Sequence, residues 1–84
     1  MLRFPQTNYF QYVRQRPDRA IIKDEWISLA ISRPDFEEIQ SDGRIRRWVR
    51  ISEFGNRVLR VILLADGQTV HNAFFDRNYQ EKKQ

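Results

Sequence analysis

The second half of this sequence is the part that most constrains its fold, because strand-like segments alternate there with short turn signatures. The segments lie at residues 36–40, 44–51, 57–64 and 69–76. Asp42-Gly43 separates the first two segments, and Asp66-Gly67 separates the last two. Because Asp-Gly between such segments is a strong hairpin signal, we expect consecutive antiparallel strands.

The first half of the chain has helical periodicity instead. Thr7 or Asn8 can cap a first helix that runs to about residue 16. A second helix is expected over residues 23–32, where apolar side chains recur at spacings of three and four. Pro34 ends that helix, since the residue before a proline is pushed out of the helical region.

These patterns predict a single α+β domain over residues 1–84. Two N-terminal helices are expected to pack on a four-stranded antiparallel sheet, and an extra edge strand at residues 2–4 is left open. Helices on one side leave the other face of such a sheet open. That open face is where we expect the chain to meet its partner.

The composition of the chain favours an acidic partner. The 84 residues carry a formal net charge of +4, and arginines gather between residues 44 and 60 whereas lysine is nearly absent there. Arginine suits forked contacts to phosphate or carboxylate groups. There is no cysteine, there is one histidine, and there is no apolar run long enough to span a bilayer. We therefore expect a cytoplasmic protein with no cofactor, no metal centre and no membrane partner.

The expected turns assign each strand residue to one face of the sheet. We assume two-residue turns at both Asp-Gly pairs and a five-residue loop at residues 52–56. The helix-covered face then carries Phe36, Ile45, Val49, Leu59, Val61, Leu63, Val70 and Phe74. The open face carries Arg46, Trp48, Arg50, Arg60, His71 and Phe75. This register keeps Arg46, Arg50 and Arg60 out of the core, where an unpaired charge would cost several kcal/mol.

Several stretches resemble the small bacterial toxin-like domains of the RelE/BrnT superfamily. They are Arg16-Pro17-Asp18-Arg19, Glu25-Trp26-Ile27, and residues 41–48, 59–64 and 66–77. The resemblance implies a metal-independent endoribonuclease toxin that acts on free or ribosome-bound RNA. It also implies a small acidic antitoxin-like protein as a second partner. A homodimer is left open.

Metal-free RNA cleavage needs a base, an acid and fixed positive charge around the phosphate. His71 is the first candidate for base or acid, since its imidazole titrates near neutral pH. Arg60, in the middle of a hydrophobic strand, is the candidate clamp for the scissile phosphate. By resemblance, Arg77 and Tyr79 follow the last strand where a superfamily enzyme places catalytic groups.

A second set of residues suits RNA binding rather than catalysis. Arg44, Arg46 and Arg50 alternate around Trp48, a pattern typical of surfaces that contact an RNA backbone and stack a base. A solvated edge, with nearby glutamates neutralising these arginines, would produce the same pattern.

Simpler roles are also open for the candidate catalytic residues. His71 can fill a sheet position and bond a carbonyl group, and Arg60 can be an ion-paired arginine that covers Trp48. With these roles the chain would be a noncatalytic RNA- or protein-binding module that docks an acidic partner protein.

Overall fold

The computed structural model describes residues 2–79, which form short helices and a four-stranded sheet. The elements are α1 (Asn8–Val13), α2 (Pro17–Ala20), α3 (Asp24–Ser32), β1 (Phe36–Ile39), β2 (Ile45–Ile51), η1 (Ser52–Phe54), β3 (Arg57–Leu63) and β4 (Val70–Phe75). The strands are antiparallel neighbours in the order β1-β2-β3-β4. The predicted α+β class and the four-stranded antiparallel sheet are confirmed.

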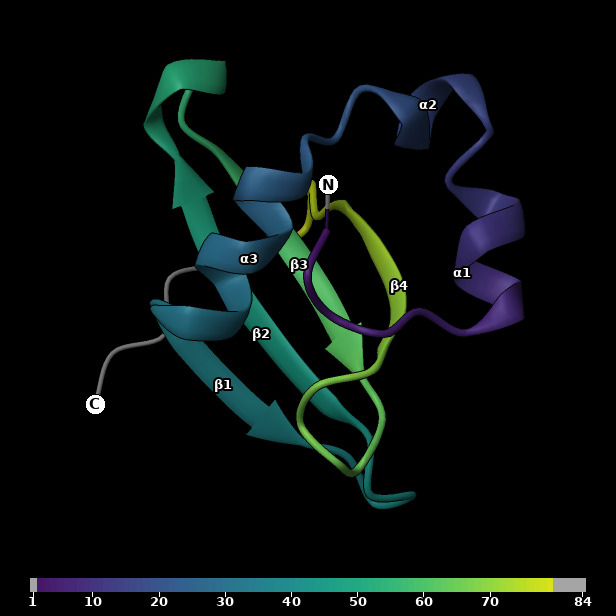
Figure 1. Ribbon diagram of the computed structural model, residues 1–84. Coiled ribbons are helices and arrows are strands. Elements are labelled where there is room, and N and C mark those ends of the chain that lie inside the picture. Colours follow the sequence, from purple (N-terminus) through teal and green to yellow (C-terminus); the bar gives the residue numbers. More distant parts are fainter. Residues whose placement is uncertain (1, 80–84) are drawn as a thin grey trace.

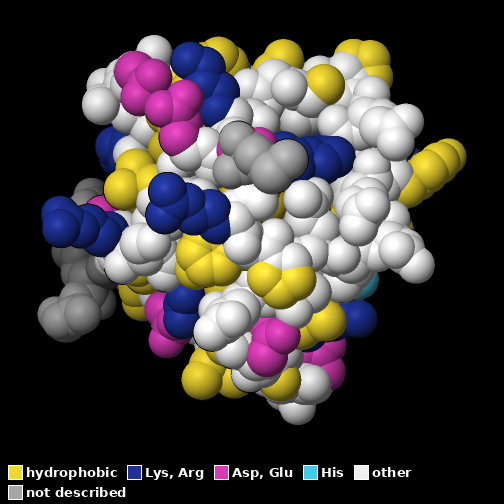
Figure 2. Space-filling view, in the orientation of Figure 1, with side chains coloured by type: hydrophobic (Ala, Val, Ile, Leu, Met, Phe, Trp, Pro, Cys, Tyr) yellow, Lys and Arg dark blue, Asp and Glu magenta, His cyan; other side chains and the backbone are white. Residues whose placement is uncertain are grey.

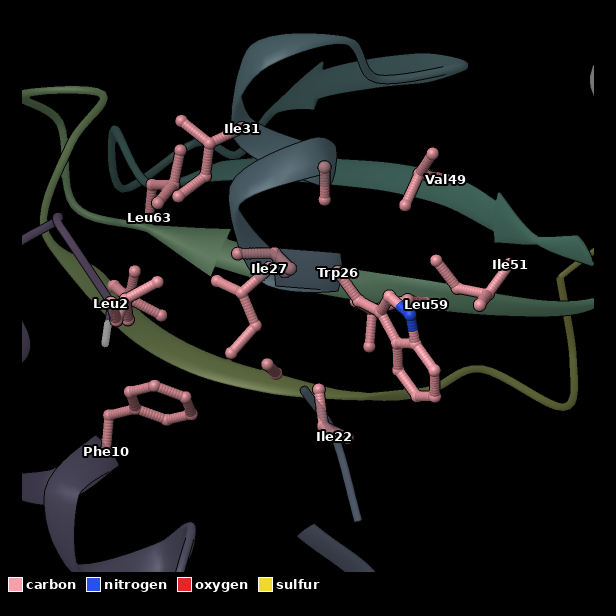
Figure 3. Packing of buried hydrophobic residues seen from close by; sticks show 14 of the residues in the cluster. Leu2, Phe10, Ile22, Trp26, Ile27, Ile31, Val49, Ile51, Leu59 and Leu63 are labelled. Carbon is pink, nitrogen blue, oxygen red and sulfur yellow. The ribbon is translucent and has the colours of Figure 1, made fainter. Parts of the chain in front are cut away.

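The helices lie in two places relative to the sheet. Figure 1 shows α3 across one face of the sheet, with α1 and α2 toward the side of β4. Trp26, Ile27, Ala30 and Ile31 of α3 are buried against this face. In Figure 3, Trp26 lies close to Ile22 and Leu59, and Phe10 reaches the same cluster from α1. The core therefore forms mainly between α3 and the sheet.

The N-terminal half contains one more helix than predicted. Thr7 caps α1 by accepting a hydrogen bond from the Phe10 backbone N–H at 3.1 Å, and α1 ends at Val13 rather than near residue 16. Pro17 then opens α2, where its fixed φ and missing N–H suit the first helical turn. Only two helices were predicted in the N-terminal half and none over this segment, so that prediction is wrong.

The first hairpin turn is one residue longer than predicted. Gln40 pairs with Arg44 through a backbone hydrogen bond of 2.7 Å, which leaves a three-residue loop that ends at Gly43 with φ of 91°. Only glycine adopts this conformation without steric cost. The extra residue reverses the faces of β1, so Phe36 pairs with Trp48 on the open face. The prediction that Phe36 lies in the core is therefore wrong.

The central register of the sheet agrees with the prediction. Val49 pairs with Leu59 and Trp48 pairs with Arg60, and the connection between β2 and β3 has the expected five residues. Part of that connection is η1, which Gly55 ends in a left-handed conformation with φ of 64°. Arg46, Trp48, Arg50 and Arg60 consequently share the face that α3 does not cover.

The last hairpin begins as predicted and then shifts by one residue. Leu63 pairs with Val70 as expected, but a β-bulge next to this pair inserts His71 as an extra residue. Phe74 therefore lies opposite Arg60 on the open face, and Phe75 lies opposite Leu59 on the core face. The predicted places of Phe74 and Phe75 are thus exchanged, and His71 does not take the predicted place opposite Ile62.

The N-terminal segment joins β4 without forming the extra strand considered for residues 2–4. The Val70 N–H donates to the Pro5 carbonyl group at 2.8 Å, and the Thr7 N–H donates to the Val70 carbonyl group at 3.0 Å. These bonds make a single parallel bridge between Gln6 and Val70. The bridge holds the start of α1 against β4, next to the bulge.

Candidate functional site

The face of the sheet opposite α3 is closed at its centre by an aromatic and charged group, which we call the Trp48 cluster. Its members are Phe36, Trp48, Arg60, Asp76 and Tyr79. The Trp48 ring lies 5.5 Å from the Phe36 ring and 5.8 Å from the Tyr79 ring, measured between centroids. Its indole N–H donates to Asp76 Oδ2 at 3.0 Å. With 4% of its surface exposed, Trp48 cannot receive a stacking base unless the cluster opens.

Arg60 belongs to the Trp48 cluster and is ion-paired. Its guanidinium carbon lies 5.6 Å from the Trp48 ring centroid and 5.2 Å from that of Phe74, and Nη1 lies 3.7 Å from Asp76 Oδ2. Burial and the charge of Arg46 lower the pKa of Arg60, whereas Asp76 and Glu38 raise it. An arginine stays protonated at neutral pH despite such a shift. These contacts match the simpler role considered for Arg60, an ion-paired arginine that covers Trp48.

The three arginines predicted to bind RNA differ in the groups that they contact. Arg46 Nη1 donates to Glu38 Oε1 at 3.1 Å, so this arginine is paired across β1 and β2. Arg44 Nε lies 3.8 Å from Asp42 Oδ2. Arg50 is exposed, and its guanidinium donates to the Asn56 carbonyl group at 2.8 Å. Of the predicted RNA-binding residues, Arg50 is therefore the one best placed for a new anionic partner.

His71 lies beside α1 rather than in the Trp48 cluster. Its Nδ1 is 3.2 Å from Thr7 Oγ1, and its ring stacks on Tyr9 with 5.1 Å between centroids. Burial, and secondarily the positive charge of Arg44, lower the pKa of His71 below its ordinary value. Within residues 2–79, the ring and hydrogen-bond contacts of His71 do not include Arg60.

Replacing Arg44 with glutamine is expected to raise the pKa of His71. We expect the wild-type pKa to lie below 6.5, and the variant pKa to rise but stay below that value because burial remains. The pKa of His71 is lower in the folded chain than in the unfolded chain, so the unfolded chain binds the proton more readily. The free energy of unfolding should therefore fall as pH drops through 6.5. NMR titration of the imidazole ring protons measures both values. A wild-type pKa at or above 6.5 would contradict this placement of His71.

The predicted catalytic residues thus lie in three separate contact groups. His71 contacts Thr7 and Tyr9, and Arg60 and Tyr79 belong to the Trp48 cluster. Arg77 lines a cleft at the end of β4. The bulge at His71 is the main reason, because it removes the histidine from the position opposite Ile62.

Sequence reasoning did not place Arg19 or Arg57 beside Arg77, but both share this cleft with it. Arg19 reaches it from α2, where its Nη1 donates to Asn72 Oδ1 at 2.6 Å. Arg57, the first residue of β3, lies over Phe75 with its guanidinium carbon 4.7 Å from the ring centroid. The period-2 alternation of a strand places Arg57 on the same face as Leu59. Phe75 joins Arg57 on this face only in the observed register, in which Phe75 pairs with Leu59.

Arginines without carboxylate partners gather at one end of the sheet. Arg50, Arg57 and Arg77 lie where β2 ends, where β3 begins and just after β4 ends. A hydrogen bond of 2.8 Å from the Asp76 N–H to the Val58 carbonyl group fixes the end of β4 beside β3. Within the described part of the chain, none of the three forms an ion pair with a carboxylate. We call these three residues the basic end.

The face that carries α3 does not show a concentration of one type of side chain. Figure 2 shows basic side chains spread among acidic, hydrophobic and uncharged ones there. In residues 2–79, no three His, Asp or Glu side chains come together in a way that could hold a metal ion. No helix in this part of the chain has the length and apolarity needed to cross a bilayer.

Comparisons of the chain with protein-family models, with curated proteins and with solved structures give no match. The resemblance to the RelE/BrnT superfamily therefore stays a prediction. The site has to be interpreted from its own geometry and charge.

Proposed function

We propose that this chain is a noncatalytic RNA-binding domain that contacts the phosphate backbone through its basic end. The observation that supports the proposal is the gathering of Arg50, Arg57 and Arg77 at one end of the sheet without carboxylate partners among residues 2–79. Arg50 lies on the face opposite α3 and Arg57 on the face that carries α3, so this end of the sheet presents positive charge on both sides. Such unneutralised arginines attract a polyanion and can bind its phosphates with forked hydrogen bonds.

RNA fits this end of the sheet better than a lone carboxylate does, because the basic end borders two clefts. One has a volume of about 500 Å³ and includes Arg50 and Tyr79, and the other has a volume of about 350 Å³ and includes Arg57 and Arg77. A single strand offers phosphates at regular intervals and flat bases between them. Positive charge beside aromatic side chains is the usual combination in proteins that bind single strands.

Binding without cleavage is favoured by the positions of the candidate catalytic groups. Cleavage needs a base and a phosphate-stabilising cation around the same phosphate. His71 makes its contacts beside α1, whereas Arg60 is paired with Asp76 in the Trp48 cluster. A phosphate held by Arg60 would therefore lack the predicted base.

The second candidate function is the metal-independent endoribonuclease of a toxin-antitoxin pair. It is favoured by the position of His71, a half-buried imidazole whose Nδ1 lies 3.2 Å from Thr7 Oγ1 and on which the positive charge of Arg44 acts. A product that ends in a 2′,3′-cyclic phosphate, lost in a His71→Gln variant that still folds, would establish this function in place of the first.

Replacing Arg50, Arg57 and Arg77 together with glutamine is expected to weaken RNA binding about a hundredfold. Each lost phosphate contact should cost on the order of 1 kcal/mol. Fluorescence anisotropy with a labelled single-stranded RNA measures the affinity, and a denaturing gel of the same samples shows whether the RNA stays intact.

The matched control replaces Arg3, Arg16 and Arg33 with glutamine. These arginines are also exposed, and they form no ion pair with a carboxylate in the described part of the chain. Both triple variants lose the same amount of positive charge. An equal loss of affinity in the two variants would mean that net charge alone attracts RNA, and it would contradict the assignment of the basic end.

A further inference from the structure

The cleft at the end of β4 combines fixed positive charge with aromatic rings. It has a volume of about 350 Å³, which is within the usual range of small-molecule sites. The residues that matter for its chemistry are Asp18, Arg19, Arg57, Phe74, Phe75 and Arg77. We call this site the arginine cleft.

Two arginines of the cleft lie over aromatic rings. The Arg57 guanidinium carbon lies 4.7 Å from the Phe75 ring centroid and 5.3 Å from that of Phe54. The Arg19 guanidinium carbon lies 5.3 Å from the Phe74 ring centroid. A guanidinium over a ring is partly immobilised by the cation–π contact, and it can still stack a flat group on its outer face. Binding a ligand therefore costs less side-chain entropy here than at a free arginine.

The charge of the cleft is only partly neutralised. Asp18 is its one carboxylate among the described lining residues, and its Oδ2 lies 3.5 Å from Arg19 Nε. Arg19 Nη1 is held by Asn72 Oδ1 at 2.6 Å, which fixes its position at the side of β4. Arg57 and Arg77 form no ion pair within residues 2–79. An anion that enters the cleft is thus attracted mainly by Arg57 and Arg77.

We propose that the arginine cleft binds one nucleotide of the RNA. Arg57 and Arg77 hold its phosphate, and its base stacks on the outer face of the Arg57 guanidinium. This inference rests on the proposed RNA binding and assigns a nucleotide subsite to it. Bases do stack on guanidinium planes in RNA-binding proteins. An acidic peptide would satisfy the charge, but its carboxylates would make no use of the flat stacking surface over Phe75.

The test is an NMR titration of the full chain with adenosine monophosphate, with inorganic phosphate and with adenosine. We expect the monophosphate to bind at least about tenfold more tightly than either of the others, since only it makes both kinds of contact. The amide signals that move should include those of Arg19, Arg57, Phe75 and Arg77. Equal binding of the monophosphate and of inorganic phosphate, or shifts only elsewhere in the chain, would overturn the proposal.

Two substitutions separate charge from stacking. Arg57→Lys keeps the charge but loses the planar group, so it should reduce monophosphate binding to the level of inorganic phosphate. Arg77→Gln should weaken the binding of both anions, and Arg33→Gln should change neither. All three arginines are exposed, so the folded spectrum should persist in each variant. An Arg57→Lys protein that binds the monophosphate as tightly as wild type would overturn the stacking.

The outcomes for the cleft and for the proposed function can be told apart. If RNA binds through the basic end but the monophosphate does not enter the arginine cleft, only the inference about the cleft fails. If the monophosphate binds the cleft but single-stranded RNA does not bind, the proposed function fails together with the assignment of the cleft to RNA, and the cleft remains a site for a free nucleotide. A glutamate-rich peptide that displaces the monophosphate from the cleft at a lower concentration than RNA does would overturn the choice of ligand.

Discussion

Replacing Trp48 with alanine is expected to lower the free energy of unfolding by about 3–5 kcal/mol. Trp48 is 4% exposed although it lies on the face opposite α3. Its ring contacts Phe36 and Tyr79, and Arg60 covers it. The substitution removes the largest side chain of the Trp48 cluster and leaves a cavity beneath Arg60. Urea unfolding, followed by circular dichroism, measures the loss.

Trp48→Phe is the matched control for this substitution. It keeps an aromatic ring but removes the indole N–H that donates to Asp76 at 3.0 Å, so a loss of about 1–3 kcal/mol is expected. The result also bears on function. A loss below about 1 kcal/mol for Trp48→Ala, as for an exposed residue, would show that the ring is free in solution and available for base stacking.

Leu59→Ala is expected to destabilise the chain by about 2–5 kcal/mol. Leu59 is fully buried in β3, between Val49 and Phe75 of the neighbouring strands and close to Trp26 of α3 (Figure 3). A chain of 84 residues has a stability at the lower end of the usual range of roughly 5–15 kcal/mol, so this variant should be close to unfolding at 37 °C.

The control for Leu59 is Ile39→Ala in β1. Ile39 is 67% exposed, so its truncation should change stability by no more than about 0.5 kcal/mol. Thermal unfolding of the two variants, compared with wild type, measures the difference. Equal losses for Leu59→Ala and Ile39→Ala would contradict the placement of the core between α3 and the sheet.

The sequence was sufficient for the features that depend on periodicity. The apolar spacing led to the correct prediction of α3. The alternation in β2 and β3, joined by a five-residue loop, led to the correct pairing of Val49 with Leu59 and of Trp48 with Arg60. This central register depends on the length of one loop. Burying Arg46, Arg50 and Arg60 in the core would be costly, and this cost selected the correct length.

The outer strands could not be assigned in the same way. The loop that ends at Gly43 has three residues rather than two, and the bulge at His71 adds one residue to β4. Each change reverses a face, since side chains alternate with a period of two. An Asp-Gly pair fits more than one turn length, and the bulge lies where Val70 also bonds the N-terminal segment. Neither the length of this loop nor the presence of the bulge can be predicted from the local sequence pattern alone.

The candidate site could not be predicted from the sequence for a related reason. A sequence shows that arginines are present, but it does not show which of them have acidic partners in space. Arg46 and Arg60 are neutralised by Glu38 and Asp76, whereas Arg57, to which sequence reasoning gave no role, has no such partner among residues 2–79. The proposed binding surface therefore lies at the end of the sheet, whereas the sequence predicted it in the middle.

The most direct test of RNA binding at the basic end is the salt dependence of the affinity. For a single strand, the logarithm of the association constant falls with the logarithm of salt concentration by about 0.7 for each phosphate contacted. Replacing Arg50, Arg57 and Arg77 with glutamine should therefore reduce the steepness of this slope by about 2. The slope of the Arg3, Arg16 and Arg33 variant should equal that of wild type. Equal slopes for the two triple variants would contradict RNA binding at this end of the sheet.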